Sequence, residues 1–497
     1  MPYYVTTAIN YVNAVPHLGH AYEAITADVM ARNARARGEE VFFLTGTDEH
    51  GEPIADAAAA EGISPQELAD RNAARFRALA EPLELSIDFF IRTTDPEHVE
   101  RVQEVLQRVY DAGHVYLGTY EGWYCPRCAD FKTDAEIGPG NTCLIHSIPL
   151  DRQSEENYFF ALSTFQEPLE QLFAERPDFV LPRHQANAAQ AFLASGLTDV
   201  SLTRKKLTWG VSVPWDGEHV FYVWFDALLN YYTALGYARP GKDLTERYWP
   251  ATFHVIGKDI LKFHTIYWPA LLMAAGLEVP HHVWVHGFLH GPDGEKMSKS
   301  LGNVLDPFAV IEEFGADVLR HYLFREVTAG QDGPVSLDGL RTRYETELAN
   351  EYGNLASRTL NMLERYCEAR VPAVALDESL RGDLAGLAAR IDDLLDRAEL
   401  SAALEEIWQQ VRRLNRYVEE NAPWQLARDE ARADELARVL ASLAEGLRYV
   451  TVMLNPYMPG KTAELLDALG CPDLTAREFA VEGWGGPVGA LAPLFPK

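Results

Sequence analysis

The chain has 497 residues, of which 47% are hydrophobic, so it is long enough for two to four domains with ordinary cores. No apolar run is long enough to cross a bilayer, and the N-terminal residues lack the basic and apolar regions of a signal peptide, so we expect a cytoplasmic protein with no membrane partner. The formal net charge of −29 argues against a protein that coats nucleic acid, and it confines any RNA contact to a local, salt-sensitive patch.

The N-terminal residues predict one β-α-β unit. Residues 3–9 are rich in aromatic and β-branched side chains and predict a buried strand, and residues 41–44 predict a second. Between them, residues 18–37 have helical periodicity and are followed by Gly38, which suits a helix end. Strands joined in this way run parallel, with the site at their carboxyl ends. No GxGxxG follows the first strand and no GxxxxGK[ST] occurs, so nucleotide binding requires another device.

The next stretch, residues 52–114, predicts helices. Pro65 and Pro96 lie near two of the helix starts, and Ser64 and Asp95 precede them as expected caps. Proline is favoured at the first position of a helix because its missing N–H would have no partner there.

A Gly- and Pro-rich stretch that contains three cysteines interrupts this pattern, and we take residues 115–219 as an insertion. Strands are then expected at 219–225, 252–256 and 282–286, with a helix at 258–272. These elements restore the parallel sheet.

From about Leu305 the sequence is almost wholly helical, and Leu404, Ile407 and Val411 keep helical spacing. We expect a helix bundle to the end of the chain, with a loose tail after Gly485. The expected fold class is α/β, a parallel-sheet domain with an insertion, followed by an all-α helix bundle.

Four metal-type ligands occur as two short-spaced pairs, Cys125 with Cys128 and Cys143 with His146. Zinc prefers four N or S ligands in a tetrahedron, and pairs separated by two residues on tight turns supply that geometry. The alternative is a set of unrelated buried thiols. Because protein side chains would fill all four positions, we expect one structural Zn²⁺ per chain.

Two further motifs carry basic side chains. His17 and His20 lie three residues apart where the helix 18–37 begins, so both rings can face one spot at a helix N-terminus, which attracts anions. Lys296 and Lys299 follow a Gly-rich stretch and suit a polyphosphate that gains charge in a transition state. Taken singly, such histidines are more often structural and such lysines equally often solvated. Together, with a sheet between them, they favour one phosphate site.

The sequences HLGH at 17–20 and KMSKS at 296–300 resemble the two hallmark motifs of the class I aminoacyl-tRNA synthetases. Within that class the chain resembles the methionyl-tRNA synthetase family, through TTAINY, GTDEHG, YVWFDAL, GKDI and the single zinc knuckle. The resemblance runs from about residue 3 to the end. It implies a Rossmann-like catalytic domain that uses methionine, ATP with Mg²⁺, and tRNA(Met), including the initiator. Composition and spacing alone indicate no particular amino acid.

The resemblance also implies domain limits and residue roles. The expected domains are 1–114 (first half of the catalytic domain), 115–219 (connective insertion with the zinc knuckle), 220–290 (second half), 291–345 (KMSKS loop and stem-contact region) and 346–497 (α-helical anticodon-binding domain). The expected catalytic residues are His17, His20, Lys296 and Lys299. The expected ATP-binding residues are these four with Arg204, Gly257 and Asp259. The expected methionine-binding residues are Asp48, which would pair with the ammonium, and Ala8, Ile9, Tyr11, Trp224, Ala227, Leu228, Tyr231, Ile260 and His264. The expected anticodon-binding residues are Asn354, Arg358, Pro423 and Trp424.

Two alternatives stay open at this point. A cysteinyl enzyme would require a thiolate-binding zinc in the catalytic pocket, and no cysteine lies near the first strand. A non-catalytic zinc and RNA-binding module would have degraded histidines or lysines in the two motifs, and all four are intact. A monomer is expected, because some relatives continue beyond the Pro496 region into a dimer-forming tRNA-binding module.

Overall fold

The computed structural model describes residues 2–13, 15–127, 130–132, 136–291, 294 and 305–496. The predictions made for Cys128, Lys296 and Lys299 lie outside these residues. None of the described helices combines the length and the apolar character that crossing a bilayer requires.

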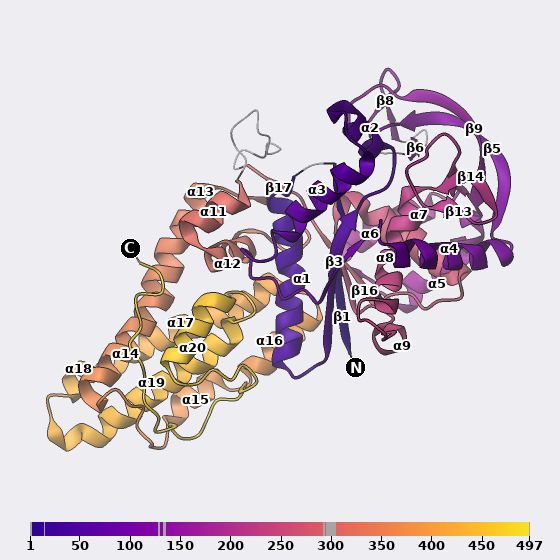
Figure 1. Ribbon diagram of the computed structural model, residues 1–497. Helices are drawn as coiled ribbons and strands as arrows, with labels where there is room; N and C mark the ends of the chain where they lie inside the picture. Colours follow the sequence, from indigo (N-terminus) through magenta and orange to yellow (C-terminus); the bar gives the residue numbers. More distant parts are fainter. Residues whose placement is uncertain are drawn as a thin grey trace.

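A parallel sheet lies at the centre of the molecule (Figure 1). Its strands run in the order β10, β16, β15, β1, β3, and both β2 and β4 pair with β3. Strands β1, β3 and β15 are buried along their whole length, as a sheet covered on both faces requires. The bounds are β1 Tyr3–Thr7, β2 Asn10–Tyr11, β3 Val41–Asp48, β4 Phe89–Arg92, β10 Val180–Leu181, β15 Phe253–Gly257 and β16 His282–His286.

The predicted β-α-β unit is confirmed. Helix α1 (Leu18–Ala36) connects β1 to the parallel strand β3, so its N-terminus lies at the carboxyl edge of the sheet. The helix is followed by Gly38 at φ +81°, a conformation that glycine adopts without strain. Both expected cap residues hold the N-cap position. Ser64 precedes α3 (Pro65–Arg77) and its side chain accepts from the Glu67 N–H, whereas Asp95 precedes α4 (Pro96–Asp111) without a capping hydrogen bond from its side chain.

The sequence does not predict three of the sheet strands, β2, β4 and β10. The strand expected at 219–225 is also not in this sheet, because these residues end an antiparallel strand of a separate sheet and begin a helix. Strand β4 lies within residues 52–114, which are expected to be helical, and β10 lies within the expected insertion 115–219. Both strands are short and lie next to helices, so neither gives a clear periodic signal. They are strands because each pairs in parallel with a neighbour, β4 with β3 and β10 with β16. The chain of the insertion therefore returns once to the central sheet.

The insertion is built on a long antiparallel pair, β5 (Val115–Cys125) and β9 (Asp151–Phe160), at the right of Figure 1. Its other elements are β6 Asp130–Lys132, β7 Ile137–Gly138, β8 Thr142–Cys143, α5 Gln166–Glu175, α6 Arg183–Ala194, β11 Val200–Ser201, β12 Thr203–Arg204, β13 Ser212–Val213 and β14 Asp216–Phe221. The remaining elements around the sheet are α2 Glu52–Glu61, α7 Val223–Leu228, α8 Asn230–Thr233, α9 Thr245–Tyr248, the π-helical turn η5 Phe263–Tyr267, α10 Trp268–Ala274 and β17 Leu289–His290.

The C-terminal part is helical, as predicted, and extends to the lower left of Figure 1. Its elements are α11 Pro307–Phe314, α12 Ala316–Glu326, β18 Gly333–Pro334, α13 Leu337–Arg343, the π-helix η7 Tyr344–Gly353, α14 Asn354–Cys367, α15 Glu378–Leu384, α16 Leu387–Asp396, α17 Leu400–Asn421, α18 Pro423–Leu426, α19 Ala433–Leu454 and α20 Pro459–Ala468.

The end of the chain packs back onto the bundle. Leu494 and Phe495 are buried, the Phe495 ring contacts Tyr344 and Tyr352, and the Tyr344 hydroxyl donates to the Pro496 carbonyl at 2.6 Å. The expectation of a loose tail after Gly485 is therefore wrong, because this apolar pair finds a buried site that the local sequence does not reveal.

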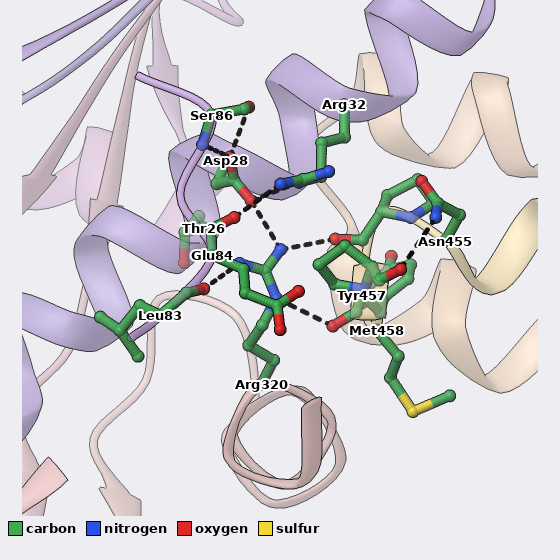
Figure 2. Close-up of polar contacts among 12 residues, drawn as sticks. Thr26, Asp28, Arg32, Leu83, Glu84, Ser86, Arg320, Asn455, Tyr457 and Met458 are labelled. Carbon is green, nitrogen blue, oxygen red and sulfur yellow. Dashed lines mark hydrogen bonds and ion pairs between the residues drawn. The ribbon is translucent and has the colours of Figure 1, made fainter. Parts of the chain in front are cut away.

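One arginine joins the sheet to the bundle (Figure 2). The fully buried Arg320 of α12 donates to the Asp28 carboxylate on α1 (2.7 Å) and to the carbonyls of Leu83 (3.1 Å), Pro456 (2.7 Å) and Tyr457 (3.0 Å). The last two carbonyls follow α19. Arg320 thus links α1 to α12 and to the end of α19 through four hydrogen bonds.

Candidate active site

His17 and His20 form a stacked pair at the N-terminus of α1. His17 is the N-cap, since its Nδ1 accepts from the Gly19 N–H (3.1 Å), and the His20 Nδ1 accepts from the His17 N–H (3.1 Å). The two ring centroids are 3.6 Å apart. Because both Nδ1 atoms act as acceptors, each neutral ring carries its proton on Nε2 and can donate it to an anion. The structure brings together the two histidines that the spacing predicts to face one spot.

The His20 imidazole is neutral at physiological pH. Burial, and then the neighbouring rings of His17 and His286, lower the pKa of His20 to about 3. The neutral His20 ring can therefore act as a hydrogen-bond donor at the N-terminus of the helix, rather than as a fixed positive charge.

Asp48 ends β3 and is buried. Its Oδ1 has no hydrogen-bond partner among the described residues. Burial, and then the charge of Asp226, hold the pKa of Asp48 well above its usual range. A buried carboxylate with an unpaired oxygen is poised to bind a cation such as an ammonium group.

Aromatic side chains form a wall near this carboxylate. The Tyr231 hydroxyl lies 2.8 Å from the His264 Nε2, and the His264 Nδ1 lies 3.1 Å from the Ile260 carbonyl. Because a carbonyl can only accept, Nδ1 carries the proton of His264, and Tyr231 donates to Nε2. Trp224 stacks on Phe263 with ring centroids 3.8 Å apart. The wall thus combines flat apolar faces with one oriented polar pair.

The other predicted methionine-binding residues lie around the same cluster. Ala8, Ile9 and Tyr11 follow β1 and pack on one hydrophobic core together with Leu228 and Tyr231. The Tyr11 hydroxyl donates to the His50 carbonyl at 2.8 Å, and Ala227 is buried on α7 next to Leu228. The structure therefore gathers the predicted residues at the carboxyl ends of β1, β3 and β15, where a small apolar ligand with a cationic group could bind.

Gly257 ends β15 and Asp259 follows it, and both lie beside His286. A Cβ on Gly257 would lie 2.6 Å from the Asp259 Oδ1, so a side chain at this position would displace the carboxylate. The neighbouring His286 at the end of β16 pairs with Glu23 of α1 at 3.1 Å. These groups line the carboxyl edge between two strands, the usual position of a nucleotide in an open parallel sheet.

Arg204 lies on β12 and is buried. Its Nη1 donates to the Ser201 hydroxyl (2.8 Å) and to the Thr203 carbonyl (3.0 Å), and its guanidinium carbon lies 4.3 Å from the centre of the Tyr222 ring. These contacts hold Arg204 within the insertion and at the start of α7. Its predicted role at the phosphates stays a prediction.

Three of the four predicted metal ligands converge. The ligand atoms of Cys125, Cys143 and His146 all lie within 4.8 Å of one another, and each sulfur is 3.8 Å from the His146 Nδ1. Both cysteines are buried. Two thiols and an imidazole at these distances could hold a metal ion.

A second candidate site lies at the end of the bundle that is far from the sheet, near α18 in Figure 1. Arg358 of α14 lies 5.6 Å from the centre of the Trp424 ring and pairs with Glu419 of α17 at 2.7 Å. Asn354 lies one turn before Arg358 on the same helix face and is exposed, and Pro423 begins α18. The structure thus places an aromatic ring, a guanidinium and an amide together, a set that can stack on and hydrogen-bond to unpaired bases.

Sequence reasoning missed a buried network next to Asp48. Asp226 accepts from His50 (2.6 Å) and from His98 (2.8 Å), and all three side chains are buried. These residues come from separate elements, so no spacing in the sequence brings them together. The only available signal was that His50 lies in GTDEHG and Asp226 in YVWFDAL.

The comparisons with known proteins agree with this geometry. The family model described as tRNA synthetases class I (M) matches residues 3–147 and 140–360. The Methionine--tRNA ligase of Rhizobium meliloti is 44% identical over 512 aligned positions, which cover 100% of this chain and 98% of that protein. The Methionine--tRNA ligase of Caldanaerobacter subterraneus subsp. tengcongensis is 42% identical over 481 positions, 96% of this chain and 75% of that protein.

A solved structure shares the whole fold. The methionyl-tRNA synthetase of Mycobacterium tuberculosis in complex with methionyl-adenylate superposes with a TM-score of 0.95 at 41% identity, and the match covers 100% of both chains. The parallel sheet, the insertion and the helical bundle therefore occur together in a protein that holds an aminoacyl-adenylate.

Proposed function

Because the chain belongs to the methionyl-tRNA synthetases of class I, we propose that it activates methionine and charges tRNA(Met) for initiation and elongation in the cytoplasm. In the first step the methionine carboxylate attacks the α-phosphorus of ATP, and the bond to pyrophosphate breaks. In the second, a hydroxyl of the 3′-terminal adenosine attacks the acyl carbon, AMP leaves and the hydroxyl proton is released. The observation that carries the proposal is the stacked His17–His20 pair at a helix N-terminus, in a chain 44% identical over its full length to a Methionine--tRNA ligase.

The first step depends on positioning and on charge. The Nε2–H groups of His17 and His20, together with the N-terminus of α1, donate to phosphate oxygens as negative charge shifts toward pyrophosphate. Lys296 and Lys299 belong to the motif expected to meet the charge on the leaving group. Arg204, Gly257 and Asp259 complete the proposed ATP set, and Mg²⁺ travels with the phosphates.

A pyrophosphate-exchange panel across amino acids tests the function. Exchange that depends on methionine and exceeds that with leucine or cysteine by at least about 100-fold is expected, because the pocket must reject near-isosteres. Equal exchange with cysteine would favour the cysteinyl alternative. No exchange with any amino acid would favour the non-catalytic RNA-binding module.

Asp48→Asn is expected to weaken methionine binding and to stabilise the ligand-free protein. The substrate ammonium pairs with the ionised carboxylate, so removing the charge should raise the methionine dissociation constant by about 10- to 100-fold. The folded-state pKa of Asp48 is raised, so its contribution to stability is present below the unfolded pKa and is lost as pH rises through the folded pKa. Asparagine does not ionise, so the variant should keep the stability that the wild type loses when Asp48 ionises. Its melting temperature at neutral pH should therefore be higher.

The raised pKa of Asp48 also sets the pH dependence of methionine binding. Wild-type affinity for methionine should fall as pH drops through the raised pKa, since a proton then competes with the ammonium, and Asp48→Asn should lack this dependence. Calorimetric titrations of methionine at a series of pH values from acidic to neutral would measure it. A pH-independent wild-type affinity would contradict the proposed pairing.

We propose zinc as the metal at the knuckle, with Cys128 as the fourth ligand. Cys143→Ser should reduce the bound zinc from about one per chain to near zero and lower the melting temperature, because structural zinc sites contribute folding energy. Atomic emission spectroscopy after dialysis measures the zinc bound per chain. Cys367→Ser, at a half-buried cysteine on α14, is the matched control and should keep its zinc. A Cys143→Ser protein that retains a full complement would exclude this ligand.

We propose that Asn354, Arg358, Pro423 and Trp424 read the anticodon. Trp424→Ala should raise the KM for tRNA(Met) by about 5- to 150-fold, because one lost base stack weakens binding by about 1–3 kcal/mol. Methionine-dependent pyrophosphate exchange without tRNA should not change. Arg365→Ala, an exposed arginine further along α14, serves as the control. Equal effects of Trp424→Ala on exchange and on charging would point to misfolding instead.

A further inference from the structure

Asp226 uses both carboxylate oxygens inside the protein. Its Oδ2 lies 2.6 Å from the His50 Nδ1, and its Oδ1 lies 2.8 Å from the His98 Nε2. The His98 Nδ1 in turn lies 2.7 Å from the Thr233 hydroxyl. Because an ionised carboxylate only accepts, His50 carries a proton on Nδ1 and His98 on Nε2. The Thr233 hydroxyl contacts the other ring nitrogen, so both nitrogens of the His98 ring are engaged inside the protein.

The carboxylate is charged although it is fully buried. Burial alone would raise the pKa of Asp226, but the opposing effects of His50 and His98 hold it at about 2. A buried ion costs several kcal/mol in desolvation, and an apolar side chain of similar size would often fill such a site at no loss of stability. The retained charge therefore points to a need for fixed geometry rather than for stability.

The network joins the elements that carry the proposed methionine site. His50 follows Asp48 by two residues on the loop after β3, and Asp226 lies on α7 between Trp224 and Ala227. Thr233 lies on α8 with Tyr231. One carboxylate thus connects the residue proposed to bind the ammonium with the helices that form the aromatic wall.

We propose that Asp226 is a positioning residue for methionine, which fixes the Asp48 loop against α7 and α8 so that the ammonium group and the side-chain wall meet one substrate. The proposal rests on the proposed function and adds to it a residue that touches neither substrate nor reacting atoms. Its charge also acts on Asp48, whose other titratable neighbours are Glu49, Tyr11 and Tyr231.

Asp226→Asn tests the proposal with little change in volume. The amide keeps one acceptor oxygen but turns an NH₂ group toward an N–H donor, so one histidine must change its tautomer or lose its contact. The KM for methionine in pyrophosphate exchange should rise about 10- to 100-fold, as for loss of a charge-assisted hydrogen bond, while the KM for ATP stays within about twofold. The fall of methionine affinity with decreasing pH should also move to lower pH, because a negative neighbour of Asp48 is gone. Asp216→Asn, at a half-buried aspartate 3.8 Å from His219, is the matched control and should behave as wild type.

A methionine KM within about twofold of wild type, or equal increases for methionine and ATP, would overturn the proposal. If Asp226→Asn does not fold, His98→Gln and His98→Phe replace it. Glutamine can keep the donor to Asp226 and should preserve the methionine KM, whereas phenylalanine removes the donor and should raise it; equal values would overturn the proposal. Wild-type exchange serves as the reference, so its absence would refute the function itself, while an unaffected variant would refute only the role of Asp226.

Discussion

Replacement of His20 by alanine is expected to lower methionine-dependent pyrophosphate exchange by about 100- to 1,000-fold. The His20 Nε2–H is a preorganised donor to the phosphates, and the loss of one such donor from a transition state typically costs this much. Its Nδ1 accepts from the His17 N–H, so the substitution also removes half of the capping box and frees the His17 ring with which it stacks. The methionine dissociation constant should change little, since the proposed ammonium and side-chain contacts lie elsewhere.

Two further variants separate chemistry from folding. His20→Gln can retain an N–H donor on a side chain of similar length and should recover part of the rate, whereas His281→Ala, at an exposed histidine far along the chain, should behave as wild type. Pyrophosphate exchange with the three purified variants measures these effects. A loss of less than about fivefold in His20→Ala would show that the phosphates are held by other groups.

Local sequence signals predicted the elements that depend on local physics. The strand 3–9, the helix 18–37 with Gly38 after it, and the helix starts at Pro65 and Pro96 follow from periodicity and from the preference for proline at the first helical position. Strands β4 and β10 depend instead on partners far along the chain. The burial of Phe495 likewise depends on Tyr344 and Tyr352, so a terminal apolar pair gave no usable signal.

The residues of the candidate site also differ in whether local sequence could identify them. His17 and His20 are close in sequence and share a helix start, so their spacing alone predicts that the rings meet. Asp48 and Trp224 could be assigned only from the family resemblance, because nothing local distinguishes a site carboxylate from a core one. Neither local spacing nor the family resemblance identified Asp226, because its partners His50 and His98 lie 176 and 128 residues away in the sequence.

The junction between sheet and bundle gives the second large expected effect. Arg320→Met should lower the free energy of unfolding by about 3–5 kcal/mol, the usual result of removing one partner of a buried ion pair. The carbonyls of Leu83, Pro456 and Tyr457 lose their donor, while Asp28 keeps Arg32 (2.8 Å) as a partner. Urea titrations followed by tryptophan fluorescence measure the change.

A double-mutant cycle separates the interaction energy of Asp28 and Arg320 from the effect of changed packing at each position. Asp28→Leu leaves the buried guanidinium without an anion and also removes the acceptor of the Ser86 N–H and hydroxyl, so it should destabilise the protein more than Arg320→Met does. In the double variant neither Arg320 nor Asp28 leaves a buried charge behind, although the partly exposed Arg32 also loses Asp28. The combined loss should fall below the sum of the single losses by at least about 1 kcal/mol. Strict additivity would show that the two residues act independently.

The contact should also affect catalysis, because α1 carries His17 at its N-terminus. Each single variant should therefore lower the rate of pyrophosphate exchange at temperatures where it remains folded. An unchanged rate would show that the orientation of α1 does not depend on the contact between Asp28 and Arg320.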